Sequence, residues 1–206
     1  MTTAKDEILN RIKTARGHTI PPIERGYLRE GLLSAADRID LFIDRLNDYG
    51  AAVYRASLQY VPQTVAGILR SRSKTGLLVP GGLDPAWLPD GFDFIRADTL
   101  TYAEIDSSEG VLTGCAVAIA MTGTIVVRHS PGEGRRALTL IPDYHLCIVF
   151  EHQVVETVAE AIQRMTEFAT YPITTVSGPS ATSDIEMTRI KGVHGPRTLE
   201  ILLVAD

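Results

Sequence analysis

The stretch that decides the fold is AAVYRASLQYVPQTVAGILRSRSKTGLLVP, residues 51–80. AAVYRAS (51–57) has the pattern of a β-strand, and VPQTVAGILRS (61–71) has the period of a helix with Pro62 in its first turn. GLLVP (76–80) is a second apolar strand. A strand, a helix and a further strand in succession indicate an α/β fold.

Two helices are predicted before this stretch. Residues 5–16 place four apolar side chains on one face, and the breaker-rich segment 18–31 predicts a loop, so the first helix is expected to be an appendage. A longer amphipathic helix is predicted to start after Ser34, a suitable N-cap. We therefore expect an N-terminal helical extension over residues 1–33 and one α/β domain over residues 34–206.

The later segments continue the alternation of strands and helices. CAVAIAMTGTIVVR (115–128) predicts a hairpin or a tight crossover, and Trp87 is expected to anchor a turn-rich loop by packing. Helices are predicted over residues 153–165 and 183–191. The remaining predicted strands are DFIRA (93–97), HLCIVF (145–150), ITTVSG (173–178) and TLEILLVAD (198–206). Near-continuous apolar strands favour a mainly parallel sheet with helices on both faces.

Composition excludes several classes of protein. The chain has 206 residues, 45% of them hydrophobic and 22% charged, with a net charge of -5, so a nucleic-acid binder is not expected. No apolar run reaches the length of about 18 residues that a membrane span needs, and the first residues lack an apolar signal core, so we expect a cytoplasmic protein. Cys115 and Cys147 lie in separate apolar runs and are expected to be buried reduced thiols, with no metal held by this chain.

Three loops are candidates for a site, because ligands of parallel sheets collect beyond the carboxyl ends of strands. They are residues 121–124 with Thr122, Gly123 and Thr124, residues 129–145, and the segment from Ser177. In the second loop, Gly132, Gly134, Arg135 and Arg136 could bind an anion through backbone N–H groups and guanidinium groups. The alternative is a mobile loop with solvated arginines.

Asp143 and His145 are two residues apart, so in a strand they would share a face and could form an oriented acid-imidazole pair for catalysis or metal binding. Alternatively, Asp143 caps the turn after Pro142 and His145 satisfies a buried contact. Cys147 is not expected to be a nucleophile, because burial would raise its pKa and hide the thiol.

The third loop combines hydroxyl groups with charges. Ser183 and Glu186 have the spacing of a capping box, and acidic residues in that first turn make the helix start a poor phosphate site. An anion bound here would instead meet Lys191, His194 or Arg197, or the arginines of the second loop.

Three blocks together resemble a known family: AIAMTGTIVV from Ala118, GRRALTLIPDYHLCIV from Gly134, and SGPSATSDIEMTRIKGVHGPRTLEILLV from Ser177. They are similar to the lactate-utilisation protein C family, the LutC/YkgG-type proteins built on a LUD domain. The matching positions include the Thr122–Thr124 turn, Arg136, Asp143, His145, Ser180, Thr182, Glu186 and His194. The chain departs from the pattern at Met121, where an acidic residue is common, and at Ala181, where a basic residue often follows.

The resemblance implies a fold similar to the NagB/RpiA/CoA transferase-like group. It also implies participation in the oxidation of L-lactate to pyruvate beside partner proteins that carry iron-sulfur clusters, this chain holding no cofactor alone. In the fold that the resemblance implies, Ser180, Thr182 and His194 are expected at the strand ends, near a small carboxylate or phosphate ligand.

Two other functions remain open. One is a stand-alone enzyme that acts on an acyl-coenzyme A or a sugar phosphate, with Asp143, His145 and Glu186 as acids and bases and with Arg135, Arg136, Lys191 or Arg197 holding the anion. The other is a ligand-sensing or assembly module.

Overall fold

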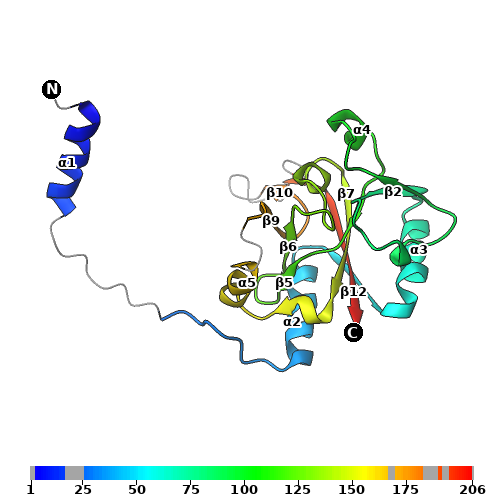
Figure 1. The fold of residues 1–206 in the computed structure, drawn as a ribbon. Coiled ribbons are helices and arrows are strands. Elements are labelled where there is room, and N and C mark those ends of the chain that lie inside the picture. Colours follow the sequence, from blue (N-terminus) through cyan, green and yellow to red (C-terminus); the bar gives the residue numbers. More distant parts are fainter. Residues whose placement is uncertain (1–2, 17–25, 167–169, 183–189, 192–194, 206) are drawn as a thin grey trace.

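The computed structural model describes residues 3–16, 26–166, 170–182, 190–191 and 195–205. The described residues form two larger sheets and a two-stranded sheet of β10 and β11 (Figure 1). The larger sheet has six strands in the order β1-β12-β7-β4-β2-β3, and every pair in it is parallel. Its strands are β1 Ala52–Ser57, β2 Gly76–Val79, β3 Asp93–Arg96, β4 Val111–Thr113, β7 Tyr144–Phe150 and β12 Thr198–Ala205. The predicted α/β fold with a mainly parallel sheet is confirmed.

The centre of this sheet explains the near-continuous apolar strands of the sequence. β7 and β12 lie side by side, with Leu199 opposite His145, and both strands are covered on two faces. A strand of this kind needs apolar side chains at odd and even positions alike. A polar side chain in β7 or β12 must therefore find a partner within the protein.

Helices α2 (Ala35–Asp48) and α3 (Val61–Ser71) cover opposite faces of the larger sheet (Figure 1). Ser34 caps α2 as predicted, since its hydroxyl accepts the N–H of Asp37 at 3.2 Å. Phe42 and Leu46 of α2 are fully buried against one face. Burial of such a side chain stabilises the fold by about 1.5–3 kcal/mol.

A smaller sheet, not predicted from the sequence, shares the α2 face of the larger one. Its order is β8-β5-β6-β9, and β6 pairs antiparallel with both β5 and β9. The strands are β5 Val117–Ile119, β6 Thr124–Arg128, β8 Val154–Val155 and β9 Ile173–Ser177. The predicted hairpin around the 121–123 turn is therefore confirmed as β5 and β6.

Two of the predicted helices are partly wrong. The segment from Gln153 begins as strand β8, and helix α5 covers only Val158–Met165. Pairing of Val154 with Ala118 of β5 outweighs the local helical pattern. The helix predicted over residues 183–191 lies mostly outside the described residues, but its end is a strand: β11 (Ile190–Lys191) pairs antiparallel with β10 (Ala181–Thr182).

The short elements complete the domain. Trp87 packs against Phe150 with ring centroids 5.4 Å apart, as predicted for a loop anchor. The remaining elements are α4 Tyr102–Asp106 and the 3-10 turns η1 Leu58–Tyr60, η2 Pro85–Trp87, η3 Arg136–Thr139 and η4 Glu151–Gln153.

The N-terminal part holds helix α1 (Ala4–Arg16), whose apolar side chains Ile8, Leu9 and Ile12 are exposed. Further on, the N–H of Leu33 donates to Glu156 at 2.7 Å, which ties the segment before α2 to the domain. The division of the chain at residue 33 stays a prediction. Within the ranges that the structure describes, none of the helices combines the length and apolar character needed to cross a membrane.

Candidate functional site

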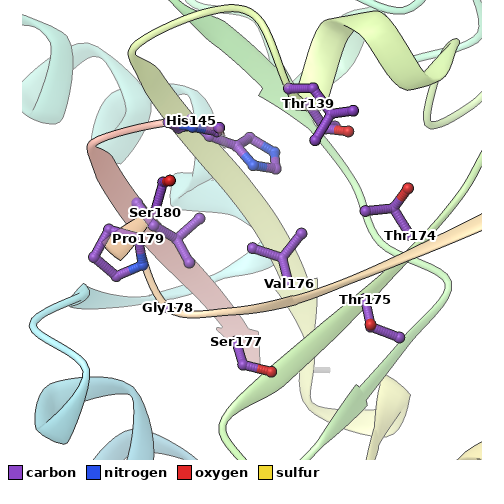
Figure 2. Close-up of a pocket in the computed structure, with 13 residues that line it drawn as sticks. Thr139, His145, Thr174, Thr175, Val176, Ser177, Gly178, Pro179 and Ser180 are labelled. Atoms are coloured by element: carbon purple, nitrogen blue, oxygen red, sulfur yellow. The ribbon is translucent and has the colours of Figure 1, made fainter. Parts of the chain in front are cut away.

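A cavity of about 250 Å³ lies between the end of β9 and the beginnings of β7 and β12 (Figure 2). Imidazole, hydroxyl and backbone groups line it together with a few apolar side chains, and the lining includes no charged side chain among the described residues. Its walls are Thr139, Leu140, His145, Thr174, Thr175, Val176, Ser177, Gly178, Pro179, Ser180, Gly195, Pro196 and Leu199.

This cavity lies at the other end of the parallel strands from the one where ligands usually bind. His145 and Leu199 are the second residues of β7 and β12, so the cavity lies at the amino ends of these parallel strands. The carboxyl-end rule assumes that loops after the strands build the site. Here β9 of the smaller sheet forms the second wall of the cavity.

His145 is the central group of the site. Its side chain is fully buried, and Figure 2 shows the imidazole ring extending from β7 toward the space framed by Thr139, Thr174 and Val176. Nε2 lies 2.8 Å from the hydroxyl of Thr113 on β4. Nδ1 has no hydrogen-bond partner in the part of the chain that the structure describes.

This unpartnered nitrogen is available to a ligand. A buried polar atom without a partner costs about 1–3 kcal/mol, and a catalytic role or a bound water or ion is the usual explanation of such an atom. If the Thr113 hydroxyl donates to Nε2, then Nδ1 carries the hydrogen and can donate to an anion; the opposite tautomer makes Nδ1 an acceptor. Thr113 therefore decides which kind of ligand atom His145 can bind.

The predicted loop 121–124 reaches the cavity indirectly. Thr122 and Thr124 share a hydrogen bond of 2.7 Å between their hydroxyl oxygens, and Thr124 shares another of 2.7 Å with Ser177, which lines the cavity. Gly123 has φ +56°, and a Cβ there would lie 2.9 Å from Cβ of Arg45. The turn thus supports Ser177 and does not itself contact the cavity.

Ser180 is a predicted residue that does line the cavity. Its backbone N–H donates to the carbonyl of Pro196 at 2.8 Å, which joins the two segments that close this side. Gly178, also in the lining, has φ +80°, and a Cβ there would lie 2.5 Å from Cβ of Tyr49. Glycine is therefore required at the turn that presents Ser180.

The predicted pair of Asp143 and His145 does not form. Asp143 precedes β7, its side chain is 66% exposed, and it binds Arg197 through two hydrogen bonds of 2.6 and 2.9 Å. This bond with Asp143 raises the pKa of Arg197. The strand begins at Tyr144, so Asp143 turns toward solvent while His145 enters the core. Arg197 is consequently occupied on the surface and is absent from the cavity lining.

The arginines of the predicted anion loop lie outside this cavity, and their assignment stays a prediction. The Arg135 guanidinium donates to the carbonyl of Leu100 and lies 5.9 Å from the ring centroid of Tyr102, away from the cavity. Arg136 is exposed and begins η3, whose last residue, Thr139, lines the cavity. The loop contributes a hydroxyl group rather than cations.

Four of the predicted site residues have no described side chain. Glu186 and His194 lie outside the described residues, as do Ser183 and the proposed capping box. Thr182 and Lys191 are placed by their backbones in β10 and β11, where Thr182 pairs with Ile190 and Ala181 with Lys191. Their assignments stay predictions.

Sequence reasoning missed Thr113, Thr139 and Thr174. Thr113 belongs to β4, a three-residue strand that was not predicted. Thr174 binds Nε2 of His129 at 2.8 Å, and this bond holds the second loop against β9. A single threonine inside a short apolar run was the available signal, since a buried hydroxyl needs a partner.

The thiols of Cys115 and Cys147 are buried and are not joined by a disulfide, as predicted. The expectation that burial controls the pKa of Cys147 is wrong. Burial raises this pKa, but the neighbouring Cys115, His145 and Thr113 side chains outweigh burial and lower it, while the contact with Cys147 and burial raise the pKa of Cys115. Cys147 thus belongs to the polar network behind His145. Among the described residues, no group of three or more His, Cys, Asp or Glu side chains is placed to hold a metal ion.

Comparisons with known proteins agree with these observations. A model of the LUD domain matches residues 39–204. "Lactate utilization protein C" of Deinococcus radiodurans is 43% identical over 204 residues, which are 98% of this chain and 95% of that protein. The protein of the same name in Bacillus subtilis is 33% identical over 101 residues, 46% of this chain and 42% of that protein. A crystal structure of a DUF162 family protein from Deinococcus radiodurans superimposes with a TM-score of 0.73 at 41% identity, over 84% of this chain and 99% of that one.

Proposed function

Because this chain belongs to the LUD-domain family, we propose that it is a cytoplasmic, non-redox component of L-lactate utilisation whose cavity at His145 binds a small 2-hydroxy or 2-keto carboxylate. The observation that carries the proposal is the unpartnered Nδ1 of His145, in a chain that matches a lactate-utilisation protein over nearly its full length.

The chemistry of the cavity suits such a ligand. With the Thr113 hydroxyl donating to Nε2, the Nδ1–H of His145 can donate to a carboxylate or a carbonyl oxygen. Ser180 supplies a hydroxyl group to the lining, which can serve the 2-hydroxy or 2-keto oxygen. No carboxylate among the described lining residues would repel the anion.

The oxidation itself is assigned to partners. Iron-sulfur clusters usually take four cysteine ligands, and this chain has two cysteines, both buried. We therefore propose that partner proteins with iron-sulfur clusters accept the electrons, while this chain binds or presents the carboxylate.

Calorimetric titration of the full chain with L-lactate and with pyruvate tests the binding step. We expect saturable binding, weakened roughly tenfold or more in His145→Gln, because a hydrogen bond to a charged group contributes about 1.5–3 kcal/mol. Asp143→Asn is the matched control, since this exposed side chain binds Arg197 at the surface, and it should bind like the wild type.

Three results would contradict the proposal. Equal affinity in the wild type and in His145→Gln would remove the assigned site. Lactate-dependent reduction of an electron-accepting dye by the isolated chain would show a redox enzyme rather than a non-redox component. Turnover of an acyl-coenzyme A or a sugar phosphate that needs Asp143 would favour the stand-alone enzyme instead.

A further inference from the structure

A second cavity, of about 210 Å³, lies at the opposite end of β7 from His145. It opens beyond the carboxyl ends of β2, β4 and β7, which end at Val79, Thr113 and Phe150. This is the edge of a parallel sheet where ligands usually bind. The first cavity does not occupy that edge, so this position is unassigned.

Two walls of the second cavity are flat and apolar. The rings of Trp87 and Phe150 contact each other at a tilt of 49°, and Leu83 and Ile148 extend the apolar surface. The Gln153 amide donates to the carbonyl of Cys115 at 2.7 Å and accepts the N–H of Phe150 at 2.8 Å, so its hydrogen bonds hold this wall in place. Rigid aromatic walls favour a flat ring as the occupant.

The polar part of the cavity is acidic. Glu133 is only 6% exposed and lines the cavity. The hydroxyl of Ser130 donates to it, and the guanidinium of Arg128 donates at 3.4 Å, a long distance for a charged pair. A carboxylate has about four acceptor positions, so Glu133 retains capacity for one more donor. Asp84 adds a second carboxylate to the lining, which disfavours anions.

Two glycines leave the interior of the cavity open. A Cβ at Gly132 would meet nothing nearer than the hydroxyl oxygen of Ser130 at 4.0 Å. A Cβ at Gly114 would lie 3.8 Å from the Trp87 ring. Neither position needs glycine to avoid a backbone clash, so the missing side chains leave space that a ligand can fill.

We propose that the second cavity binds a flat heteroaromatic ring that carries N–H donors, stacked against Trp87 with an N–H group directed at Glu133. A carboxamide-bearing or amino-bearing nitrogen heterocycle has this chemistry. An anionic carboxylate such as the ligand proposed for His145 does not, because Glu133 and Asp84 repel it.

Trp87 is the only tryptophan of the chain, so its fluorescence reports on this cavity. The full chain is titrated with nicotinamide and with nicotinate, which share a ring and differ in a carboxamide against a carboxylate. We expect a saturable change with nicotinamide and at least roughly tenfold weaker binding of nicotinate, since only the carboxamide donates to Glu133. Adenine is a second donor-bearing probe and should also bind.

Two variants locate the binding. Gly132→Val should weaken the binding of nicotinamide roughly tenfold by filling the cavity, whereas Gly26→Val, at an exposed position where a Cβ would meet nothing within 4 Å, should not. Glu133→Gln should reduce the preference for nicotinamide over nicotinate. Thermal melting curves establish that each variant is folded.

The proposal is overturned if neither nicotinamide nor adenine produces a saturable change, or if Gly132→Val binds nicotinamide like the wild type. His145→Gln should leave the nicotinamide titration unchanged while it weakens carboxylate binding. The two sites can therefore fail independently.

Discussion

Replacing Thr113 with valine tests the hydrogen bond that orients His145. The two side chains have nearly the same shape, so the change removes the hydroxyl without opening a cavity. Both residues are fully buried, and the bond between the Thr113 hydroxyl and Nε2 measures 2.8 Å. Since Nδ1 already lacks a partner, the variant leaves both ring nitrogens without a protein partner among the described residues.

The size of the effect follows from two opposing terms. An unsatisfied buried polar atom costs about 1–3 kcal/mol, and the added methyl group of valine returns up to about 0.8 kcal/mol by its burial. The free energy of unfolding should therefore fall by about 1–2 kcal/mol, against a total of about 5–15 kcal/mol for a typical domain. With a urea dependence of about 1–3 kcal/mol per molar, the unfolding midpoint should fall by roughly 0.3–2 M.

Urea unfolding followed by circular dichroism measures this shift, and calorimetry measures the binding of L-lactate by the same samples. Binding should weaken as well, because the tautomer of His145 is no longer held. Thr64→Val is the control, since its hydroxyl donates to the carbonyl of Tyr60 near the surface and should change stability by less than about 0.5 kcal/mol. A Thr113→Val variant that unfolds and binds like the wild type would refute the role of this hydrogen bond.

Three further predictions concern stability. Gly178→Ala should lose about 2 kcal/mol or more in chemical denaturation, because it combines φ +80° with a clash against Tyr49. Gly50→Ala, with φ +79° and nothing within 4 Å, should lose only about 1 kcal/mol, and equal losses would contradict the steric argument. Burial raises the pKa of Glu160, but the hydrogen bonds at the start of α5 outweigh it and lower the pKa below 4.5. The carboxylate therefore stabilises the fold above pH 4.5, and the difference in melting temperature between the wild type and Glu160→Gln should shrink as the pH falls through the folded-state pKa. Glu200→Gln should destabilise the protein by about 1–3 kcal/mol in urea, because this fully buried carboxylate accepts hydrogen bonds from three side chains; a neutral result would show that the amide can replace it.

Local patterns predicted most of the large sheet and the helices around it. The N-cap at Ser34, the strand-helix-strand segment 51–80 and the β5–β6 hairpin are where the sequence placed them. The failures lie where pairing outweighs local preference. Val154 has helical spacing with Val158, yet it lies in β8 and pairs with Ala118 of β5. A two-residue strand leaves no periodic signal of its own.

The candidate site was predicted in part. His145 and Ser180 line the cavity as members of predicted loops, while the expected acid partner, Asp143, is bound to Arg197 at the surface. The carboxyl-end rule selected residues 129–145 and the segment from Ser177, and both contribute lining residues, although the cavity lies at the amino ends of β7 and β12 because β9 of the smaller sheet builds the other wall.

By itself, the sequence determined the alternation of elements and the burial of β7 and β12, because the period of apolar residues is a property of neighbours along the chain. Only the tertiary structure decided which polar groups meet. Thr113 and His145 are 32 positions apart, and Thr124 and Ser177 are 53 apart. Their hydrogen bonds depend on the register between strands that are distant in the chain, and that register is set by the packing of the two sheets.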